Sequence, residues 1–516
     1  MINFLVKYSF VVTLVIQCNA SLRETLDTEL KILRYTKDHV DQLSSTVTGI
    51  EQSLKQILSS KIYNMDKDDQ VNTPHIAMTM LRRLVHDWPN LAIMAGKQTN
   101  LHSLQLGEVR WPTISELEQA ARNVMRSQLT YTTDSALLLR GSQTDVFVSN
   151  ITEATYFDIA RQYFLKERFV EAKELLQQAL TRVQSRDNSP SRETLLYYLA
   201  AASCFSGDET NARAILLTIT RELPQSRPPQ ELTDYYNIMG TDGCIYPNEE
   251  IYQKLNKRYY SNGIDMSAVS YYRDNAEVEN HSRLCRGEVR VDSRLVCRYV
   301  HYHQHHLRLQ PFKLEELHRD PPVVRFYDLI SDSEAEALIQ QGKSVMQPAS
   351  VGIKNARRVS EYRTSHVAWL PAGDAEWLTR RMAQATQMNT TMAHRHQLSR
   401  YSISGEYLPH RDHLIYDVDW VDDRLATLMI YLTDVEQGGN TVFTKWQLSV
   451  PPVKNSALFW FNFRPNGDPE NGSDHSGCPV LRGTKWVLNK WILNYGQDVN
   501  FPCTSDKDGS FSGFYL

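Results

Sequence analysis

The sequence predicts a multidomain α+β protein: an N-terminal helical or coiled-coil region, a tetratricopeptide-like helical domain and a C-terminal double-stranded β-helix (jelly-roll). Two observations on the 516-residue chain support this division. Helical periodicity dominates up to residue 235, and short alternating segments separated by Gly, Pro and Asn dominate from residue 319. The length suits several domains of roughly 100–200 residues each.

The composition excludes several classes of protein. Hydrophobic residues make up 41% of the chain and charged residues 22%, which argues against wholesale disorder and against a polytopic membrane protein. Lys and Arg number 56 against 60 Asp and Glu, so the net charge is −4 and nothing indicates a polyanionic partner. We therefore expect no nucleic-acid binding and no membrane span in the mature chain.

Residues 1–20 have the features of a secretory signal peptide. Lys7 precedes an apolar run from Phe10 to Ile16, and Ala20 supplies a small residue at the expected cut. The run is shorter than the ~20 residues that cross a bilayer, which favours a cleaved signal over a signal anchor. The mature chain should then enter the secretory pathway, where disulfides form.

The next segments are expected to be helical. Between Leu33 and Ile57, apolar residues follow alternating three- and four-residue steps, which predicts either a self-associating coiled coil or one amphipathic helix packed on its own domain. We assign residues 21–139 to an N-terminal helical dimerisation region.

Residues 140–235 contain a helical repeat. Two helix pairs are expected over 155–180 and 194–223, with Ala172 and Ala212 in equivalent places 40 residues apart. This offset is a tetratricopeptide period of about 34 residues plus an insertion. Such helix pairs form grooves that bind extended peptides, and the alternative is a plain helical spacer. We assign this segment to peptide-substrate binding and residues 236–318 to a linker region with a disulfide.

Residues 319–516 should form the β-rich domain. The expected strands cover 398–407, 425–432, 441–443, 457–462 and 485–493. A closed double-stranded β-helix is the natural architecture for so many short strands, and chemistry should lie on its inward faces.

Six cysteines remain after Cys18 leaves with the signal, an even number that suits an oxidising compartment. Pairing between cysteines close in sequence is the economical expectation. The expected pairs are Cys285 with Cys297, and Cys478 with Cys503. Cys204 lies in an apolar helical stretch and is expected to be a buried free thiol. Four Asn-x-Ser/Thr sequons of the expected mature chain are candidate glycosylation sites: Asn150, Asn280, Asn389 and Asn471.

The sharpest chemical signal is His410-Arg411-Asp412, followed after 62 intervening residues by His475. Residues i and i+2 of a strand point to the same face, so His410 and Asp412 can hold adjacent positions of one metal while a distant strand supplies His475. Two imidazoles and one carboxylate leave the opposite face open for a chelating cosubstrate and O₂, which is typical of non-haem Fe(II) sites.

The motif around these residues carries a family resemblance. Tyr401, Gly405 and Tyr407 precede the first histidine, a Gly438-Gly439-x-Thr441-x-Phe443 segment follows, and Lys485 lies ten residues after His475. In this pattern the chain resembles the 2-oxoglutarate-dependent prolyl hydroxylases, and among them the catalytic α subunits of collagen prolyl 4-hydroxylase. The resemblance is strongest from residue 319 to 503 and weakest in the N-terminal helix.

The resemblance implies a reaction and a ligand set. Family members use Fe(II), O₂ and 2-oxoglutarate to hydroxylate peptidyl proline to 4-hydroxyproline, release succinate and CO₂, and need L-ascorbate to rescue oxidised iron. Lys485 would bind the distal carboxylate of 2-oxoglutarate, with Tyr401 and Thr441 as hydrogen-bond donors. A buried ammonium needs an anion, and a solvated surface lysine is the alternative. Tyr407 would lie near the substrate proline or else be a core aromatic.

The same resemblance implies partners and a compartment. It predicts an α₂β₂ tetramer with protein disulfide isomerase as the β subunit, in the lumen of the endoplasmic reticulum, acting on collagen-like proline-containing chains. In the helical repeat, Tyr163 and Tyr198 are the candidate peptide-binding residues, although aromatic residues in an apolar stretch are more often core.

Two departures from the family pattern keep other functions open. Eight residues after Lys485 the collagen enzymes have a histidine, and this chain has Leu493, which shares strand parity with Lys485 and cannot donate a hydrogen bond. The tyrosine stripe of the peptide groove is reduced to Tyr198, with Ala201 and Cys204 at the next two positions. The alternatives are a catalytically weak or inactive peptide-binding or assembly subunit, and a hydroxylase of non-collagen secreted proteins.

Overall fold

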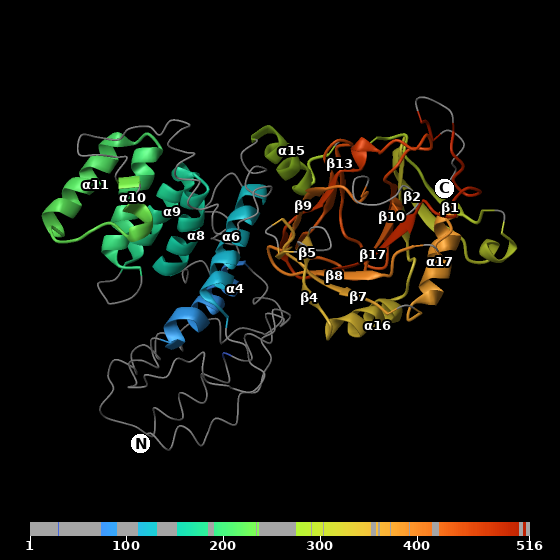
Figure 1. Ribbon diagram of the computed structural model, residues 1–516, viewed down its shortest axis with the longest axis horizontal. Helices are drawn as coiled ribbons and strands as arrows, with labels where there is room; N and C mark the ends of the chain where they lie inside the picture. The colour runs from blue at the N-terminus through green and yellow to red at the C-terminus, as the bar shows by residue number, and fades with distance from the viewer. Residues whose placement is uncertain are drawn as a thin grey trace, which may run out of the picture. The chain divides into compact units, whose positions relative to one another are not determined.

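The computed structural model describes residues 29, 74–89, 112–131, 152–183, 190–233, 235–236, 275–289, 292–302, 304–351, 358–359, 362–371, 373–391, 393–414, 423–504 and 509–511. The chain divides into two compact units, residues 1–266 and 267–516 (Figure 1). The predicted signal peptide, the predicted coiled-coil or amphipathic helix of residues 33–57 and the sequon at Asn150 lie outside the described residues.

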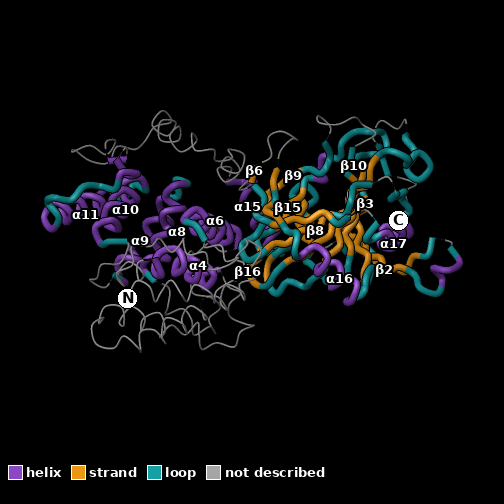
Figure 2. Tube along the Cα trace, turned by 60° about the horizontal axis from the view of Figure 1, so that its bottom comes forward, coloured by secondary structure: helices purple, strands orange, loops and turns teal. Residues whose placement is uncertain are grey.

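The described residues of the first unit form helices joined by turns and loops, which Figure 2 draws in purple and teal. Its elements are α4 (Pro74–Arg82), the π-helical turn η2 (Arg83–Asp87), α6 (Ile114–Tyr131), α8 (Glu153–Leu165), α9 (Phe169–Arg182), α10 (Arg192–Phe205), α11 (Glu209–Glu222) and the 3₁₀ turn η5 (Gln230–Leu232). The side chains of Thr152 and Ser191 cap α8 and α10 by accepting a backbone N–H three residues on. These caps fix where each predicted helix pair begins.

The helix pairs share one apolar core. Helix α9 packs on α8 and on α10, and α10 packs on α11 (Figure 1). Ala172 and Ala212 are both fully buried, as expected for small residues that allow helices to approach closely. The four helices therefore occur where the repeat predicts them, and their assignment as tetratricopeptide units stays a prediction.

The described residues of the second unit are built mainly from antiparallel sheets. The larger sheet has the order β1 (Cys297–Val300), β2 (Phe312–Arg319), β3 (Pro322–Tyr327), β14 (Ala457–Phe461), β10 (Arg424–Tyr431), β17 (Lys485–Leu493), β8 (Gln397–Tyr401), β7 (His366–Trp369) and β4 (Gln347–Pro348). The smaller sheet has the order β13 (Leu448–Val450), β12 (Thr441–Phe443), β15 (His475–Gly477) and β9 (Tyr407–His410).

Short elements complete this unit. The additional strand pairs are β5 (Ser350–Val351) with β6 (Arg358–Val359), and β11 (Gln437–Gly438) with β16 (Val480–Arg482). The helices are α15 (Asn275–Cys285), α16 (Asp332–Lys343) and α17 (Glu376–Thr386), with 3₁₀ turns η6 (His305–Arg308) and η8 (Asn471–Ser473). Ser331 and Glu334 form a capping box that starts α16.

The larger sheet has two apolar faces. Along β10, Leu428 and Ile430 join the core that includes α16 and α17, whereas Met429 and Tyr431 join Phe443 of the smaller sheet in a second core. This separation follows from the two-residue period of a strand. The inner faces of the two sheets therefore oppose each other, which is where the sequence predicts the chemistry.

Most predicted strands are confirmed, since β10, β12, β14 and β17 cover the expected segments. The single strand predicted over 398–407 is wrong, because β8 ends at Tyr401 and β9 begins at Tyr407. Between them the backbone turns: Ser404 has φ of 57°, and the N–H of Gly405 donates to the carbonyl of Ser402 at 2.7 Å. A Cβ at Gly405 would lie 2.7 Å from the carbonyl oxygen of Ser402, so this tight turn requires glycine.

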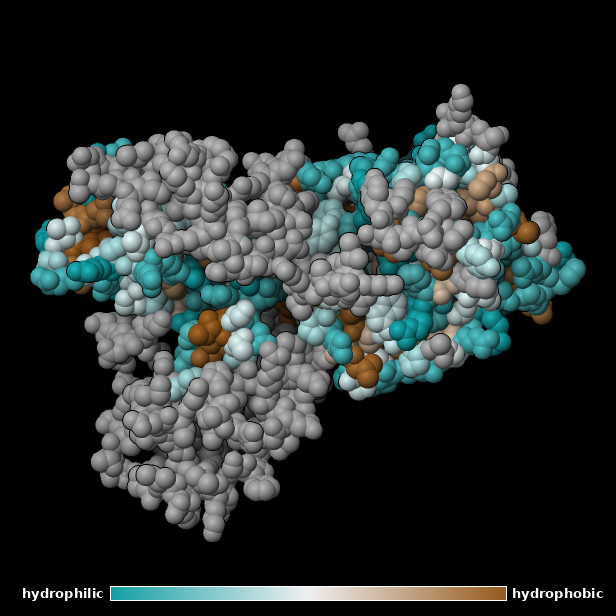
Figure 3. Space-filling view, viewed as in Figure 1, coloured by the Kyte–Doolittle hydropathy of each residue, from teal (hydrophilic) through white to brown (hydrophobic). Residues whose placement is uncertain are grey.

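The described residues that are visible in Figure 3 are mostly hydrophilic. On the face drawn in Figure 3, the apolar atoms of the described residues form small separate groups, and individual exposed side chains such as Leu217 do not by themselves mark a docking surface. None of the helices in the described ranges combines the length and the apolar character needed to cross a membrane.

Candidate active site

Two histidines face each other across the smaller sheet. His410 ends β9, His475 begins β15, and the two are direct partners in the antiparallel register, with ring centroids 4.3 Å apart. The Nδ1 atoms lie 2.8 Å from the carbonyl oxygen of Leu408 and 3.0 Å from that of Ser473. Because each ring is held through Nδ1, Nε2 of each is available to ligate a metal.

Asp412 completes a group of three donors. Its Oδ1 lies 3.9 Å from Nε2 of His410, and its Oδ2 lies 3.8 Å from Nε2 of His475. Burial opposes the charge on Asp412, but His475, His410 and Arg424 outweigh it and lower the pKa of this carboxyl to about 2. Burial and the neighbouring His475 hold the pKa of His410 well below its ordinary value. An ionised carboxylate and a neutral imidazole are the forms that bind metal, and this donor set suits Fe(II).

A chain of buried hydrogen bonds positions Asp412. Thr427 of β10 donates its hydroxyl to Oδ2 of Asp412 at 2.7 Å, and Nδ2 of Asn462 donates to that hydroxyl oxygen at 3.1 Å. Nε1 of Trp460 in turn donates to Oδ1 of Asn462 at 3.1 Å. No sequence motif marks Thr427, Asn462 or Trp460 as functional residues. Thr427 and Tyr431 lie four residues apart on β10, so the strand period predicts that both side chains face the inside of the fold. The strand period does not predict which of these inward side chains contacts a metal ligand.

Lys485 is buried beside this donor group. It begins β17 opposite Tyr401, is 3% exposed, and donates from Nζ to the carbonyl oxygen of Gly439 at 2.6 Å and to Oγ1 of Thr441 at 3.3 Å. Its Nζ lies 5.8 Å from the ring centre of Tyr401. Burial lowers the pKa of Lys485 to about 7. Both acceptors are uncharged, so a carboxylate from a ligand would supply the missing counter-charge. The structure thus brings Lys485, Tyr401 and Thr441 together.

One cavity of about 290 Å³ joins these groups. It is lined by the three donors, by Lys485 and by Thr441. Among the described lining residues, the carboxylate of Asp412 is outnumbered by cations. These are Arg363, Arg411, Arg424 and Lys485. Such a cavity attracts an anionic ligand more strongly than a neutral one.

Tyr407 forms part of the cavity wall. Its half-buried ring stacks on that of His410 with centroids 3.5 Å apart, and the guanidinium of Arg363 lies 4.7 Å from its centre. Burial raises the pKa of Tyr407 to about 12, so it stays a neutral phenol. Arg363 is fixed by donating to Oε1 of Gln397 at 3.0 Å and Oγ of Ser399 at 2.9 Å. Arg363 belongs to no sequence motif, so its place in the cavity wall could not be predicted.

Leu493 does not line the cavity, although its strand parity with Lys485 predicts that it faces the same lumen. Alternate residues of β17 line the cavity only as far as Trp491. Opposite Leu493, the register of β10 shifts between Arg424 and Ala426. The guanidinium of Arg424 lies 4.2 Å from the ring centre of Trp491 and donates to the backbone oxygen of Asp412 at 3.1 Å. The expectation that Leu493 faces the lumen is therefore wrong, and Arg424 forms that part of the wall.

The predicted disulfide pairs are also wrong. Cys285 bonds to Cys478 across 193 residues, while Cys297 and Cys503 are exposed free thiols. Helix α15 packs against strands β12 and β13 and so brings Cys285 to Cys478, which follows β15. Cys204, which was expected to be a free thiol, is disulfide-bonded.

The two aromatic residues predicted to contact a peptide are in the core. Tyr163 is 1% exposed and donates its hydroxyl to Oε1 of Gln128 at 2.9 Å, and Tyr198 is fully buried and donates to Glu231. Neither offers a surface to a substrate, so both assignments are corrected. The helical periodicity predicted the helices, but it does not show which aromatic residues are buried. Phe157 and Phe164 pack edge-on against Tyr198 and keep its ring in the core of the helical unit.

Three sequons fall on described residues. Asn471 is exposed in η8. The half-buried Asn280 and Asn389 each use Nδ2 to donate to a backbone oxygen, that of Thr444 and that of Gly496, both at 3.3 Å. A glycan on either of these two amides would replace that hydrogen bond, so Asn471 is the favoured candidate of the three.

Two family models match the sequence. The model described as the 2OG-Fe(II) oxygenase superfamily matches residues 396–493, a range that contains the three donors and Lys485. The model described as the prolyl 4-hydroxylase alpha-subunit, N-terminal region, matches residues 19–144. The two matches lie in different units of the chain.

Curated relatives match along nearly the full length. Human prolyl 4-hydroxylase subunit alpha-3 is 28% identical over 527 residues, which cover 95% of this chain and 93% of the relative. Chicken subunit alpha-2 is 29% identical over 503 residues, covering 90% and 92%, and mouse subunit alpha-1 is 27% identical over 514 residues, covering 92% and 93%.

Solved structures also match part of the chain. The viral collagen prolyl hydroxylase of Paramecium bursaria Chlorella virus-1, in complex with 2OG, is 26% identical with a TM-score of 0.27 and covers 33% of this chain and 94% of its own. The two family models and the relatives agree along the sequence, and over nearly its full length the chain is similar to the prolyl 4-hydroxylase alpha subunits.

Proposed function

We propose that this chain is the catalytic α subunit of a procollagen-proline 4-dioxygenase. It hydroxylates peptidyl proline to 4-hydroxyproline with 2-oxoglutarate and O₂, and releases succinate and CO₂. The observation that carries this proposal is that one cavity joins the His410, Asp412 and His475 donors to the buried ammonium of Lys485. A metal site with an open face and a cation for a dicarboxylate are what this reaction needs.

Each residue has a role in this proposal. His410, Asp412 and His475 hold Fe(II), which when bound supplies the oxidising chemistry, with L-ascorbate as its reductant. Lys485 binds the distal carboxylate of 2-oxoglutarate, and Tyr401 and Thr441 orient it. The neutral Tyr407 borders the space where the peptidyl proline would lie, against the ring of His410.

The other regions supply assembly and substrate binding. We assign dimerisation to residues 21–139, peptide binding to a tetratricopeptide-like domain over 140–235, a linker to 236–318 and oxygenase chemistry to 319–516. The relatives are named as alpha subunits, which supports a β-subunit partner. We identify that partner as protein disulfide isomerase in an α₂β₂ tetramer in the endoplasmic reticulum, with residues 1–20 as the signal peptide.

A hydroxylase of non-collagen secreted proteins is the second candidate. The observation that favours it is the burial of Tyr163 and Tyr198, which removes both predicted aromatic contacts from the surface of the helical repeat. Both candidates use the same cavity, so a comparison of peptides separates them while a test of the cavity does not.

The test of the cavity is anaerobic binding of Fe(II) and 2-oxoglutarate to the full-length chain, because a chelated 2-oxo acid gives Fe(II) a visible charge-transfer absorption. We expect this absorption in the wild type, its loss in His475→Ala, and at least tenfold weaker 2-oxoglutarate binding in Lys485→Ala. Lys313→Ala is the matched control, because Lys313 is an exposed lysine of the same unit that pairs with Asp328. Wild-type binding by His475→Ala would refute the proposal.

A further inference from the structure

A second group of metal-ligating side chains lies outside the proposed iron site. His281 and Cys285 are four residues apart on α15, and Cys478 directly follows β15. The three ligand atoms lie within 4.8 Å of one another. Their residues are at most 3% exposed. Neither the family resemblance nor the proposed reaction uses His281.

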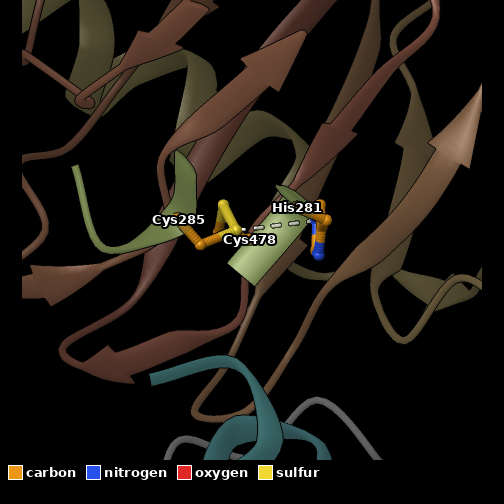
Figure 4. A group of neighbouring side chains, drawn as sticks. All are labelled: His281, Cys285 and Cys478. Carbon is orange, nitrogen blue, oxygen red and sulfur yellow. Dashed lines mark hydrogen bonds between the residues drawn. A yellow bond between two sulfur atoms is a disulfide. The ribbon is translucent and has the colours of Figure 1, made fainter. Parts of the chain in front are cut away.

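The three side chains of this group are connected by a disulfide and by close contacts of the His281 imidazole. Cys285 and Cys478 form a disulfide, and Nε2 of His281 lies 3.5 Å from Sγ of Cys285 (Figure 4). The same nitrogen lies 2.8 Å from Oγ of Ser476, the residue after the proposed iron ligand His475. Positions i and i+4 share one face of a helix, so α15 presents the imidazole and the sulfur to the same point.

This arrangement fits a tetrahedral metal that prefers sulfur and nitrogen. Zinc–sulfur bonds are about 2.3 Å and zinc–nitrogen bonds about 2.0–2.1 Å, so two such ligands of one tetrahedral zinc lie about 3.5 Å apart. Nε2 of His281 and Sγ of Cys285 have this separation. The second sulfur is already bonded to the first, so opening the disulfide is the one change needed to free both thiolates.

We propose that His281, Cys285 and Cys478 form a redox-gated zinc site. In the oxidised chain the disulfide closes the site. A dithiol reductant gives two electrons and two protons to the Cys285–Cys478 bond, which yields two thiols and leaves the reductant as its own disulfide. Zn²⁺ then displaces the two thiol protons into solvent and binds both thiolates and Nε2 of His281, with water as the fourth ligand.

The state of this site affects how firmly α15 is connected to β15, the strand that carries the proposed iron ligand His475. Two residues separate His475 from Cys478, and Gly477 between them lies close to both Lys485 and Tyr407. The disulfide and the zinc-bound form each tie α15 to this strand, whereas the reduced, metal-free form loses the tie. Zinc would therefore preserve the position of β15 when the disulfide is open.

The test uses cobalt as a spectroscopic substitute for zinc. The full-length protein carrying Cys297→Ser and Cys503→Ser, which removes the exposed free thiols of the described residues, is reduced with dithiothreitol, desalted without oxygen and titrated with Co²⁺. We expect a sulfur-to-cobalt charge-transfer absorption that one equivalent of Zn²⁺ abolishes, and no such absorption in the oxidised protein. Cobalt at the His410 site has no sulfur ligand and does not contribute to it.

Two variants in the same background separate this site from other thiols. His281→Gln keeps both cysteines and can still hydrogen-bond Ser476, and it should bind Co²⁺ at least tenfold more weakly. Cys478→Ser should lose the absorption. The proposal is overturned if the reduced protein shows no sulfur-to-cobalt absorption, or if His281→Gln and Cys478→Ser both retain it at full strength. It is also overturned if Zn²⁺ fails to raise the melting temperature of the reduced protein above its value with a chelator.

Discussion

Replacing Lys485 with methionine should stabilise the free protein and abolish its binding of 2-oxoglutarate. Burial lowers the pKa of Lys485 from 10.5 to about 7. Each pKa unit corresponds to about 1.36 kcal/mol, so the charged ammonium costs about 5 kcal/mol at pH 6. Lys485→Met removes this cost but leaves the carbonyl of Gly439 without its donor, which costs about 1–3 kcal/mol. The expected gain is about 2–4 kcal/mol at pH 6.

The sign of the pH dependence follows from the same lowered pKa. Above pH 7 the folded protein no longer carries the charge, while the unfolded chain keeps it up to pH 10.5, so the cost falls progressively between these values. At pH 9 about 2 kcal/mol of the cost remains, and the gain from methionine should nearly disappear.

Equilibrium denaturation of the full-length wild type and Lys485→Met at pH 6 and pH 9 measures this difference. Lys313→Met, at an exposed ion pair, is the control and should change stability by less than about 0.5 kcal/mol. With divalent metal present, 2-oxoglutarate should stabilise the wild type and not the variant. A Lys485→Met protein that is less stable than the wild type at pH 6, or equally stabilised at both pH values, would refute the reasoning.

Three further predictions concern single contacts. Thr427→Val removes the hydroxyl that holds Asp412 and should weaken Fe(II) binding about 10–100-fold in an anaerobic titration, so unchanged affinity would contradict its positioning role. Binding of 2-oxoglutarate should weaken as pH rises through 7, because the free protein loses the Lys485 proton that pairs with the carboxylate; calorimetry at pH 6 to 9 checks this, and a flat profile would count against Lys485 as the anion partner. Tyr198→Phe removes a buried hydrogen bond to Glu231 and should lower the free energy of unfolding by about 1 kcal/mol without changing peptide affinity; a tenfold loss of affinity in a folded protein would return Tyr198 to the binding surface.

Which side chains share a face of a strand in the second unit could be predicted from the sequence, because side chains alternate between the two faces along a strand. Alternation of side chains places His410 and His475 on one face once their strands pair, and the register makes them direct partners. Lys485 lies near the metal-ligating residues because its strand, β17, lines the same cavity. These inferences need only the two-residue period and the identity of the polar residues.

Features that depend on packing between distant segments could not be read in this way. Cys285 meets Cys478 because α15 packs on the smaller sheet, and no local spacing encodes that contact. The inward turn of Tyr198 depends on the aromatic rings around it, and the helical period does not tell a core face from a groove. Leu493 kept its parity but lies past the last position of β17 that lines the cavity.

In the proposed reaction, this cavity couples 2-oxoglutarate decarboxylation to proline hydroxylation. The most direct test supplies Fe(II), L-ascorbate, O₂ and 2-oxoglutarate to the full-length chain co-expressed with protein disulfide isomerase, with and without a Pro-Pro-Gly repeat peptide. We predict that the peptide stimulates succinate release, that 4-hydroxyproline appears in equal amount, and that Asp412→Ala abolishes both. Bound iron and 2-oxoglutarate with no hydroxyproline, in this peptide or in other proline-containing secreted chains, would contradict the claim.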